Sequence, residues 1–127
     1  MKKLLILLFS LLILPFSVYA SDVYYCSEDE TIGFKPSNNY SSENYNPMKF
    51  KILIDFENKD VISETLFMDK TRRAQKCLYD DKYDTLYCMN DLGRSFSINK
   101  LNLKYMRSNI FNIVGLTDDM LVAYGTC

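Results

Sequence analysis

The sequence predicts an all-β fold, a small antiparallel meander barrel or sandwich of about eight strands that is stabilised by disulfides. Short β-branched and aromatic runs recur at near-regular spacing, with turn residues between them and no helical period. The chain also holds four cysteines, and an even number in a short chain is typical of a disulfide framework in an exported domain. Tying the first strand to the last would favour a closed barrel, which leaves no free sheet edge.

Residues 1–20 have the pattern of a cleavable secretory signal peptide. Lys2 and Lys3 precede an apolar run over 4–14, and a short small-residue exit ends at Ala20. Because the apolar run is shorter than the ~20 residues that cross a bilayer, we expect cleavage after Ala20 rather than a membrane anchor. No membrane span is therefore expected after processing, and the protein should reach a periplasm or the cell exterior.

Residues 21–127 are expected to form a single exported β domain with little net charge. The leader carries two of the 15 basic residues, so 13 basic side chains remain against 16 acidic ones, a formal charge of −3. Neither sign forms a large cluster, and the short acidic groups, such as 28–30 and 80–81, are expected to be solvated turns. A nucleic-acid partner needs a basic face, so we expect none.

The segment from Cys77 to Cys88 predicts a hairpin. Its two cysteines lie at equal distances from a polar centre at 82–83. Folding the segment about this centre sets Cys77 opposite Cys88, Leu78 opposite Tyr87, and Asp80 opposite Thr85. A disulfide between the two strands then needs no special loop.

Four cysteines allow three connectivities. We favour Cys77 with Cys88, which closes the hairpin, and Cys26 with Cys127, which joins the first strand to the last. No Cys-x-x-Cys spacing is present, and the chain contains neither histidine nor tryptophan. Since histidine is the usual general base and a common zinc ligand, we expect no metal site, no cofactor and no enzymatic activity.

The first strand is expected over 21–28, where aromatic and β-branched residues cluster, and it should bend or end at 33–36. Residues 37–47 are rich in Asn, Ser and Pro and predict a long loop. Long loops on a rigid frame often carry binding residues, and this one would present Tyr40 and Tyr45. The alternative is a solvated connection.

Residues 49–57 form the clearest strand, because apolar residues alternate with polar ones along it. The members of its buried face are Phe50, Ile52, Ile54 and Phe56. After a turn at 58–59, residues 61–68 should return as the partner strand. A two-residue turn would bury Val61, Ser63, Thr65 and Phe67. A bulge would instead bury Ile62, Leu66 and Met68.

Residues 68–75 are charged and predict a connection or a short helical turn. A second hairpin is expected from 94–98 and 101–107, with a turn at 99–100. Its apolar pairs would be Ile98 with Leu101 and Phe96 with Leu103. The last strand pair is expected from 110–114 and 120–126.

Several short motifs follow one another along the chain: Tyr25-Cys26, Gly33-Phe34, Lys49-Phe50-Lys51, Cys77 with Cys88, Gly93 and Gly125-Thr126-Cys127. Their order resembles a pattern in uncharacterised small exported bacterial proteins and covers nearly the whole chain after the leader, but it implies no particular activity. More loosely, the leader, the aromatic-Cys start and a small disulfide-tied barrel resemble the periplasmic inhibitors of c-type lysozyme. Those inhibitors block the enzyme's cleft with a Ser-Gly-x-x-Tyr type loop. This chain has Gly93-Arg94-Ser95-Phe96 instead.

The leading functional hypothesis is a non-enzymatic exported binding or envelope-associated module with a protein or envelope partner. Tyr40, Tyr45 and Tyr83 are the candidate binding residues, because they lie in an expected loop or turn and tyrosine is common at interfaces. One alternative is an inhibitor of lysozyme or another hydrolase, and a second is a binder of a small apolar ligand in the barrel lumen. A weak hydrolase would require two carboxylates to converge in one cleft.

Overall fold

The computed structural model of the protein describes residues 21–67, 71–110 and 120–127. The expected leader, 1–20, lies outside these residues. Regular structure in the described ranges consists of nine strands and one short 3-10 turn, η2 (Pro36–Asn38). No helix in these ranges is long and apolar enough to cross a membrane. The predicted all-β class is confirmed.

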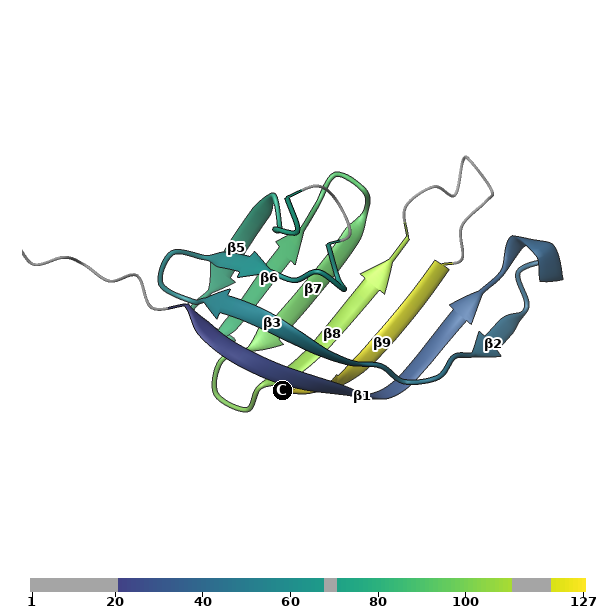
Figure 1. The fold of residues 1–127 in the computed structure, drawn as a ribbon, viewed down its shortest axis with the longest axis horizontal. Helices are drawn as coiled ribbons and strands as arrows, with labels where there is room; N and C mark the ends of the chain where they lie inside the picture. Colours follow the sequence, from purple (N-terminus) through teal and green to yellow (C-terminus); the bar gives the residue numbers. More distant parts are fainter. Residues whose placement is uncertain (1–20, 68–70, 111–119) are drawn as a thin grey trace, which may run out of the picture.

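All nine strands belong to one antiparallel sheet. Their bounds are β1 Asp22–Phe34, β2 Ser42–Asn44, β3 Lys49–Asp55, β4 Asp60–Ile62, β5 Lys76–Asp80, β6 Thr85–Met89, β7 Arg94–Asn99, β8 Lys104–Asn109 and β9 Met120–Thr126. Eight of them follow the order β4-β3-β1-β9-β8-β7-β6-β5, while β2 pairs with β1 beside this path. The path curls into a nearly closed barrel, in which β1 and β3 cross in front of β6 to β8 (Figure 1).

The long strand β1 connects the two parts of the sheet, because its two halves pair with different strands. Its first half pairs with β3, and its second half pairs with β9 and β2. A register shift between Glu28 and Glu30 separates the two halves, and such a bulge adds one residue and bends the strand. The strand expected over 21–28 therefore continues to Phe34 and ends before Pro36, which cannot donate a ladder hydrogen bond.

Residues 71–75 bring the two ends of the sheet, β4 and the β5–β6 hairpin, close together. Arg73 forms an isolated antiparallel bridge with Ile62, and the Ala74 N–H donates to the Val61 carbonyl at 2.9 Å. The N–H of Gln75 then donates to β6 at 2.9 Å. Residues 71–75 of the predicted charged connection thus run from β4 to the β5–β6 hairpin, and residues 68–70 lie outside the described residues.

The predicted alternation of β3 is confirmed, since Phe50, Ile52 and Ile54 are buried and Phe56 packs against them. On β4 the turn is longer than two residues, because Asp55 pairs with Asp60. It still buries the face expected for a two-residue turn, and the buried residues there are Val61, Ser63 and Phe67.

The strand expected over 61–68 ends at Ile62. Leu66 is buried together with its neighbour Phe67, which strand alternation would not allow. The reason is local: the Ser63 hydroxyl accepts the Leu66 N–H at 3.2 Å and closes a turn. Met68 lies outside the described residues.

The predicted turn at 99–100 is wrong. The observed pairs are Ile98 with Tyr105 and Phe96 with Arg107. The Asn99 side-chain oxygen accepts the N–H groups of Leu101 and Asn102 at 3.0 and 3.1 Å, which stabilises a longer loop. Leu103 completes it with a φ of 56°, and Leu101 is 76% exposed instead of facing the core.

The partner predicted for the last strand is also wrong. Both edges of β9 are occupied, one by β1 and the other by β8. The predicted partner strand, 110–114, begins at Ile110, whose N–H donates to the Gly93 carbonyl at 3.3 Å. Residues 111–114 lie outside the described residues. The strand that does pair with β1 is β9, so the first and last strands lie side by side, as the preferred Cys26–Cys127 disulfide predicted.

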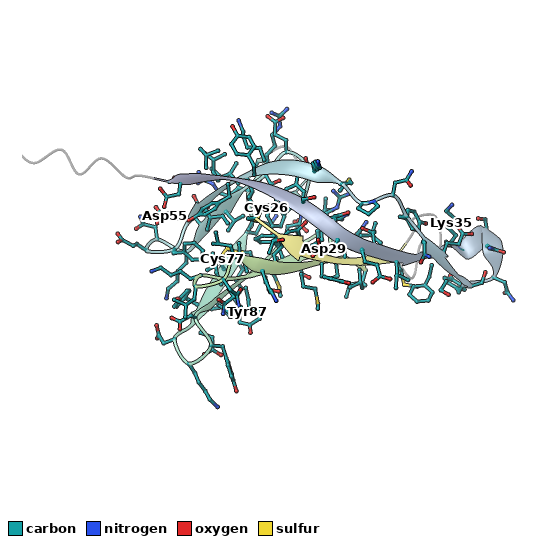
Figure 2. The ribbon with its side chains drawn as sticks, turned by 90° about the horizontal axis from the view of Figure 1, so that it is seen from below. Cys26, Asp29, Lys35, Asp55, Cys77 and Tyr87 are labelled. Carbon is teal, nitrogen blue, oxygen red and sulfur yellow. A yellow bond between two sulfur atoms is a disulfide. The ribbon has the colours of Figure 1, made fainter. Side chains whose placement is uncertain are left out.

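Both preferred disulfides are present. The terminal disulfide joins Cys26 of β1 to Cys127, and its sulfur bond is visible between β1 and the end of β9 (Figure 2). The hairpin disulfide joins Cys77 to Cys88, which are paired in register as predicted, together with the predicted pairs on either side. With no free cysteine in the chain, this chemistry is compatible with an exported protein.

Candidate functional site

A pocket of about 240 Å³ opens where the second half of β1 meets the ends of β7 and β8. Its lining residues are Thr31, Tyr45, Asn46, Met48, Thr65, Leu66, Arg94, Ser95, Arg107, Ser108, Asn109 and Leu121. Two of these are arginines and none is acidic.

A buried carboxylate lies directly behind the lining. Glu28 is 5% exposed, and its Oε2 atom accepts the Thr31 hydroxyl at 2.6 Å and the Met48 N–H at 2.8 Å. Its Oε1 atom accepts Nε of Arg107 in an ion pair whose acidic side chain is wholly buried. All three donors therefore come from residues that line the pocket.

The bulge in β1 makes this cluster possible. Glu28 and Thr31 are three residues apart, so a regular strand would point their side chains to opposite faces of the sheet. The extra residue between Glu28 and Glu30 restores the phase, and both side chains are buried on the inner face. Figure 2 labels Asp29, the bulge residue, which is exposed.

Hydrogen bonding decides the charge of Glu28. Burial by itself would raise its pKa, but the hydrogen bonds from Arg107, Thr31 and Met48 outweigh burial and lower the pKa below its usual value. The carboxylate is therefore ionised at neutral pH and balances the Arg107 guanidinium. The expectation that residues 28–30 form a solvated turn is wrong for Glu28.

Arg107 is a fixed cation at the edge of the pocket. Its side chain is 11% exposed, and Glu28 holds it through Nε. Among the described residues, its two terminal nitrogens have no hydrogen-bond partner. A guanidinium anchored in this way presents a planar pair of N–H donors in one orientation.

Arg94 is the second cation of the pocket, and it has no counter-ion within the described residues. Its guanidinium makes one long contact, 3.4 Å from Nη1 to the Leu66 carbonyl. Because Arg107 is opposite Phe96 and Arg94 is two residues before Phe96, the arginines are diagonal neighbours on one face of β7 and β8. This placement lets two guanidinium groups approach one ligand.

Apolar side chains complete the pocket: Tyr45, Met48, Leu66 and Leu121. The Tyr45 N–H donates to the Thr31 carbonyl at 2.9 Å, and the Lys35 ammonium lies 5.2 Å from the centre of the Tyr45 ring. A Cβ atom on Gly33 would lie 2.5 Å from that ring, so only glycine allows the ring to pack against β1 here.

The structure places one of the three predicted tyrosines at this pocket. Tyr45 lines it, but Tyr40 follows η2 with a φ of 60° and is not among the lining residues. Tyr83 lies in the turn of the cysteine hairpin, 56% exposed, with the Lys82 ammonium 4.9 Å from its ring centre. The role of these tyrosines in binding stays a prediction.

Sequence reasoning missed the three charged residues of the site, Glu28, Arg94 and Arg107. For Arg94 a signal was available, since it lies two and four residues before Phe96 and Ile98 and shares their inward side. No comparable signal existed for Glu28, because its burial requires both the bulge and a cation 79 residues away.

The hydrolase alternative requires two carboxylates that converge in one cleft. Among the described residues no carboxylate lines the pocket, whereas a glycosidase needs a pair of them. Across the described ranges, no three His, Cys, Asp or Glu side chains converge as a metal site. In the segment compared with the lysozyme-inhibitor loop, Phe96 is 1% exposed and belongs to the core.

No protein-family model, no characterised protein and no solved structure matches this chain.

Proposed function

We propose that the protein is an exported, non-enzymatic binding module whose pocket holds a small ligand with an anionic group and an apolar substituent. The observation that carries this proposal is Arg94, a cation that has no counter-ion among the described residues, at a pocket whose described lining holds no acidic side chain. The Glu28–Arg107 pair is neutral, so within the described part of the chain Arg94 gives the site one uncompensated positive charge. An anion would balance it.

The donor geometry fits a carboxylate or a phosphate. Each guanidinium offers parallel N–H donors that match the oxygens of these groups, and such charge-assisted bonds contribute roughly 1.5–3 kcal/mol each. Leu66, Leu121 and Tyr45 line the same pocket as Arg94 and would contact the apolar part of the ligand. At about 240 Å³ the pocket suits a ligand smaller than a typical drug, whose pockets begin near ~300 Å³.

Two observations support a binding role over catalysis. The chain lacks histidine, and Glu28 is buried and held by three donors, so it is not poised to exchange a proton with a substrate. Export is supported by the leader pattern and by two disulfides in a chain without free thiols. The lumen is filled by core side chains such as Phe67, Phe96 and Ile98, so we assign the apolar part of the ligand to the pocket.

Isothermal titration with phenylacetate, phenyl phosphate and the uncharged phenylacetamide tests the proposal. We expect measurable binding of one or both anions and at least ~10-fold weaker binding of the amide, since each charge-assisted bond contributes more than about 1.4 kcal/mol. The preferred anion distinguishes a carboxylate site from a phosphate site.

Substitutions of Arg94 test whether its positive charge binds the anion. Arg94→Gln should weaken anion binding at least ~10-fold, and Arg94→Lys should retain part of it, because an ammonium keeps the charge but loses the fork. Lys76→Gln removes one positive charge from an exposed position on β5 and is the matched control. Equal anion affinity in Arg94→Gln and wild type, or no anion binding by the wild type, would overturn the proposal.

A further inference from the structure

We propose that the outer face of β6 to β9 is a self-association surface, on which two copies of this chain pack face to face around a two-fold axis. We call this surface the outer face, and it shares Ser95 and Ser108 with the lining of the pocket. Strand alternation defines its residues: Thr85, Tyr87, Met89, Ser95, Ser97, Asn99, Lys104, Met106, Ser108, Met120, Val122, Tyr124 and Thr126. Tyr87 lies on the side of the molecule away from β1 and β3 (Figure 2).

The outer face has the composition of a protein interface rather than of ordinary surface. Lys104, near its edge, is its single charged residue, although 24% of the chain is charged. Large side chains are exposed across it, with Tyr87 of β6 at 45%, Met106 of β8 at 54% and Tyr124 of β9 at 48%. Interfaces are enriched in Tyr and Met and depleted in Lys, Glu, Asp and Ser, so the face matches this composition in its aromatic, Met and charged residues but not in its three serines.

The shape of the outer face is self-complementary, because rows of large side chains lie beside a channel of small ones. One row across the four strands, in register, is Tyr87, Ser97, Met106 and Tyr124. The next row is Met89, Ser95, Ser108 and Val122. Serines on β7 therefore form a channel between the bulky side chains of β6 and those of β8 and β9. In a two-fold dimer, the β6 ridge of each copy can enter the β7 channel of the other.

The polar atoms of the channel tolerate removal from water. The Ser95 and Ser108 hydroxyls bond to each other at 2.6 Å, and the Ser97 hydroxyl donates to the Met106 carbonyl at 3.4 Å. Each hydroxyl already has a partner, so covering the channel does not leave it unsatisfied.

Area and charge allow a second copy as the occupant. Four strands about 4.8 Å apart and roughly 20 Å long give a footprint of about 400 Å² per copy, within the ordinary range for the largest patch on a monomer. Two such faces together would bury about 800 Å², well below the ~1,200 Å² of a stable complex, which predicts a weak, concentration-dependent dimer. Because Lys104 is its single charged residue, the face provides little electrostatic selection of a foreign partner, and it brings little like-charge repulsion between identical copies.

Sedimentation-velocity ultracentrifugation of the oxidised protein after the leader, over about two decades of concentration up to roughly 0.5 mM, tests this proposal, since weak dimers form only in that range. We expect a reversible shift from monomer toward dimer. Tyr87→Lys should weaken dimerisation at least ~10-fold, because the two-fold axis brings two new charges into one contact.

Tyr25→Lys is the matched control, because Tyr25 is 77% exposed on the half of β1 that pairs with β3. It should dimerise as the wild type does, and circular dichroism should show both variants folded. Arg94→Gln should leave dimerisation unchanged, which separates this proposal from ligand binding in the pocket. A wild type that stays monomeric at the highest concentration, or a Tyr87→Lys variant that dimerises like wild type, would refute the outer face as a dimer contact.

Discussion

Replacing Glu28 by Gln tests whether the buried ion pair supports the candidate site. The substitution keeps the shape of the side chain, and the amide oxygen can still accept the Met48 N–H, but Arg107 loses its counter-ion while it remains 11% exposed. Breaking a buried pair by removing one partner typically costs 3–5 kcal/mol, and because shape and one acceptor are retained we expect about 3 kcal/mol here. Urea unfolding at pH 7, followed by circular dichroism with both disulfides intact, measures the loss.

The pH dependence gives the same argument an independent readout. Because the folded-state pKa of Glu28 is lowered, the stability it contributes is fully present above its unfolded pKa of about 4.3 and is lost as pH falls through the folded value. The difference in unfolding free energy between wild type and Glu28→Gln should therefore be largest near neutral pH. It should shrink as the pH is lowered below about 4.

Two variants sharpen the interpretation. Asp55→Asn removes an exposed carboxylate whose pKa is lowered by the Asn58 side chain and by neighbouring backbone N–H groups, and it should change stability much less than Glu28→Gln. Adding Arg107→Met to Glu28→Gln should recover part of the lost stability, because no buried charge is then left unpaired. The reasoning would be refuted if the difference in unfolding free energy between wild type and Glu28→Gln stayed constant from pH 7 to pH 3, or if it were below about 1 kcal/mol at pH 7.

Three further predictions concern the frame around the site. Removing both cysteines of the terminal disulfide should destabilise the protein more than removing those of the hairpin disulfide. In the chain-entropy model, closed loops of 101 and 11 residues correspond to losses of unfolding free energy of about 4.7 and about 2.8 kcal/mol. Equal losses in urea unfolding would contradict this order. Gly125→Ala should destabilise the protein by about 1–3 kcal/mol or prevent folding, because the new Cβ would lie 2.1 Å from the Ser27 carbonyl oxygen. A melting temperature equal to that of wild type would show that β1 and β9 can separate at this position. Tyr105→Phe should leave stability within ~1 kcal/mol of wild type or raise it, since the buried hydroxyl has no hydrogen-bond partner in the described structure, and a larger loss on thermal unfolding would show that the hydroxyl is satisfied.

Local patterns determined the elements whose partners are close in sequence. The symmetric spacing of Cys77 and Cys88 about a polar turn predicted the register of that hairpin, because a short turn leaves few alternatives. Strict alternation likewise predicted which face of β3 is buried, since successive side chains of a strand point to opposite faces. The terminal disulfide followed from cysteine number and position.

The tertiary structure decided what depends on a distant partner or on turn geometry. The Asn99 side chain stabilises a longer loop than the apolar pairs suggested, so the register of β7 with β8 moved and Arg107 came to lie opposite Phe96. The bulge in β1 then turned Glu28 inward to meet that arginine. The sequence by itself determined an all-β, disulfide-tied chain, because alternation and cysteine spacing are local. The candidate site needed the barrel, because its ion pair joins strands 79 residues apart.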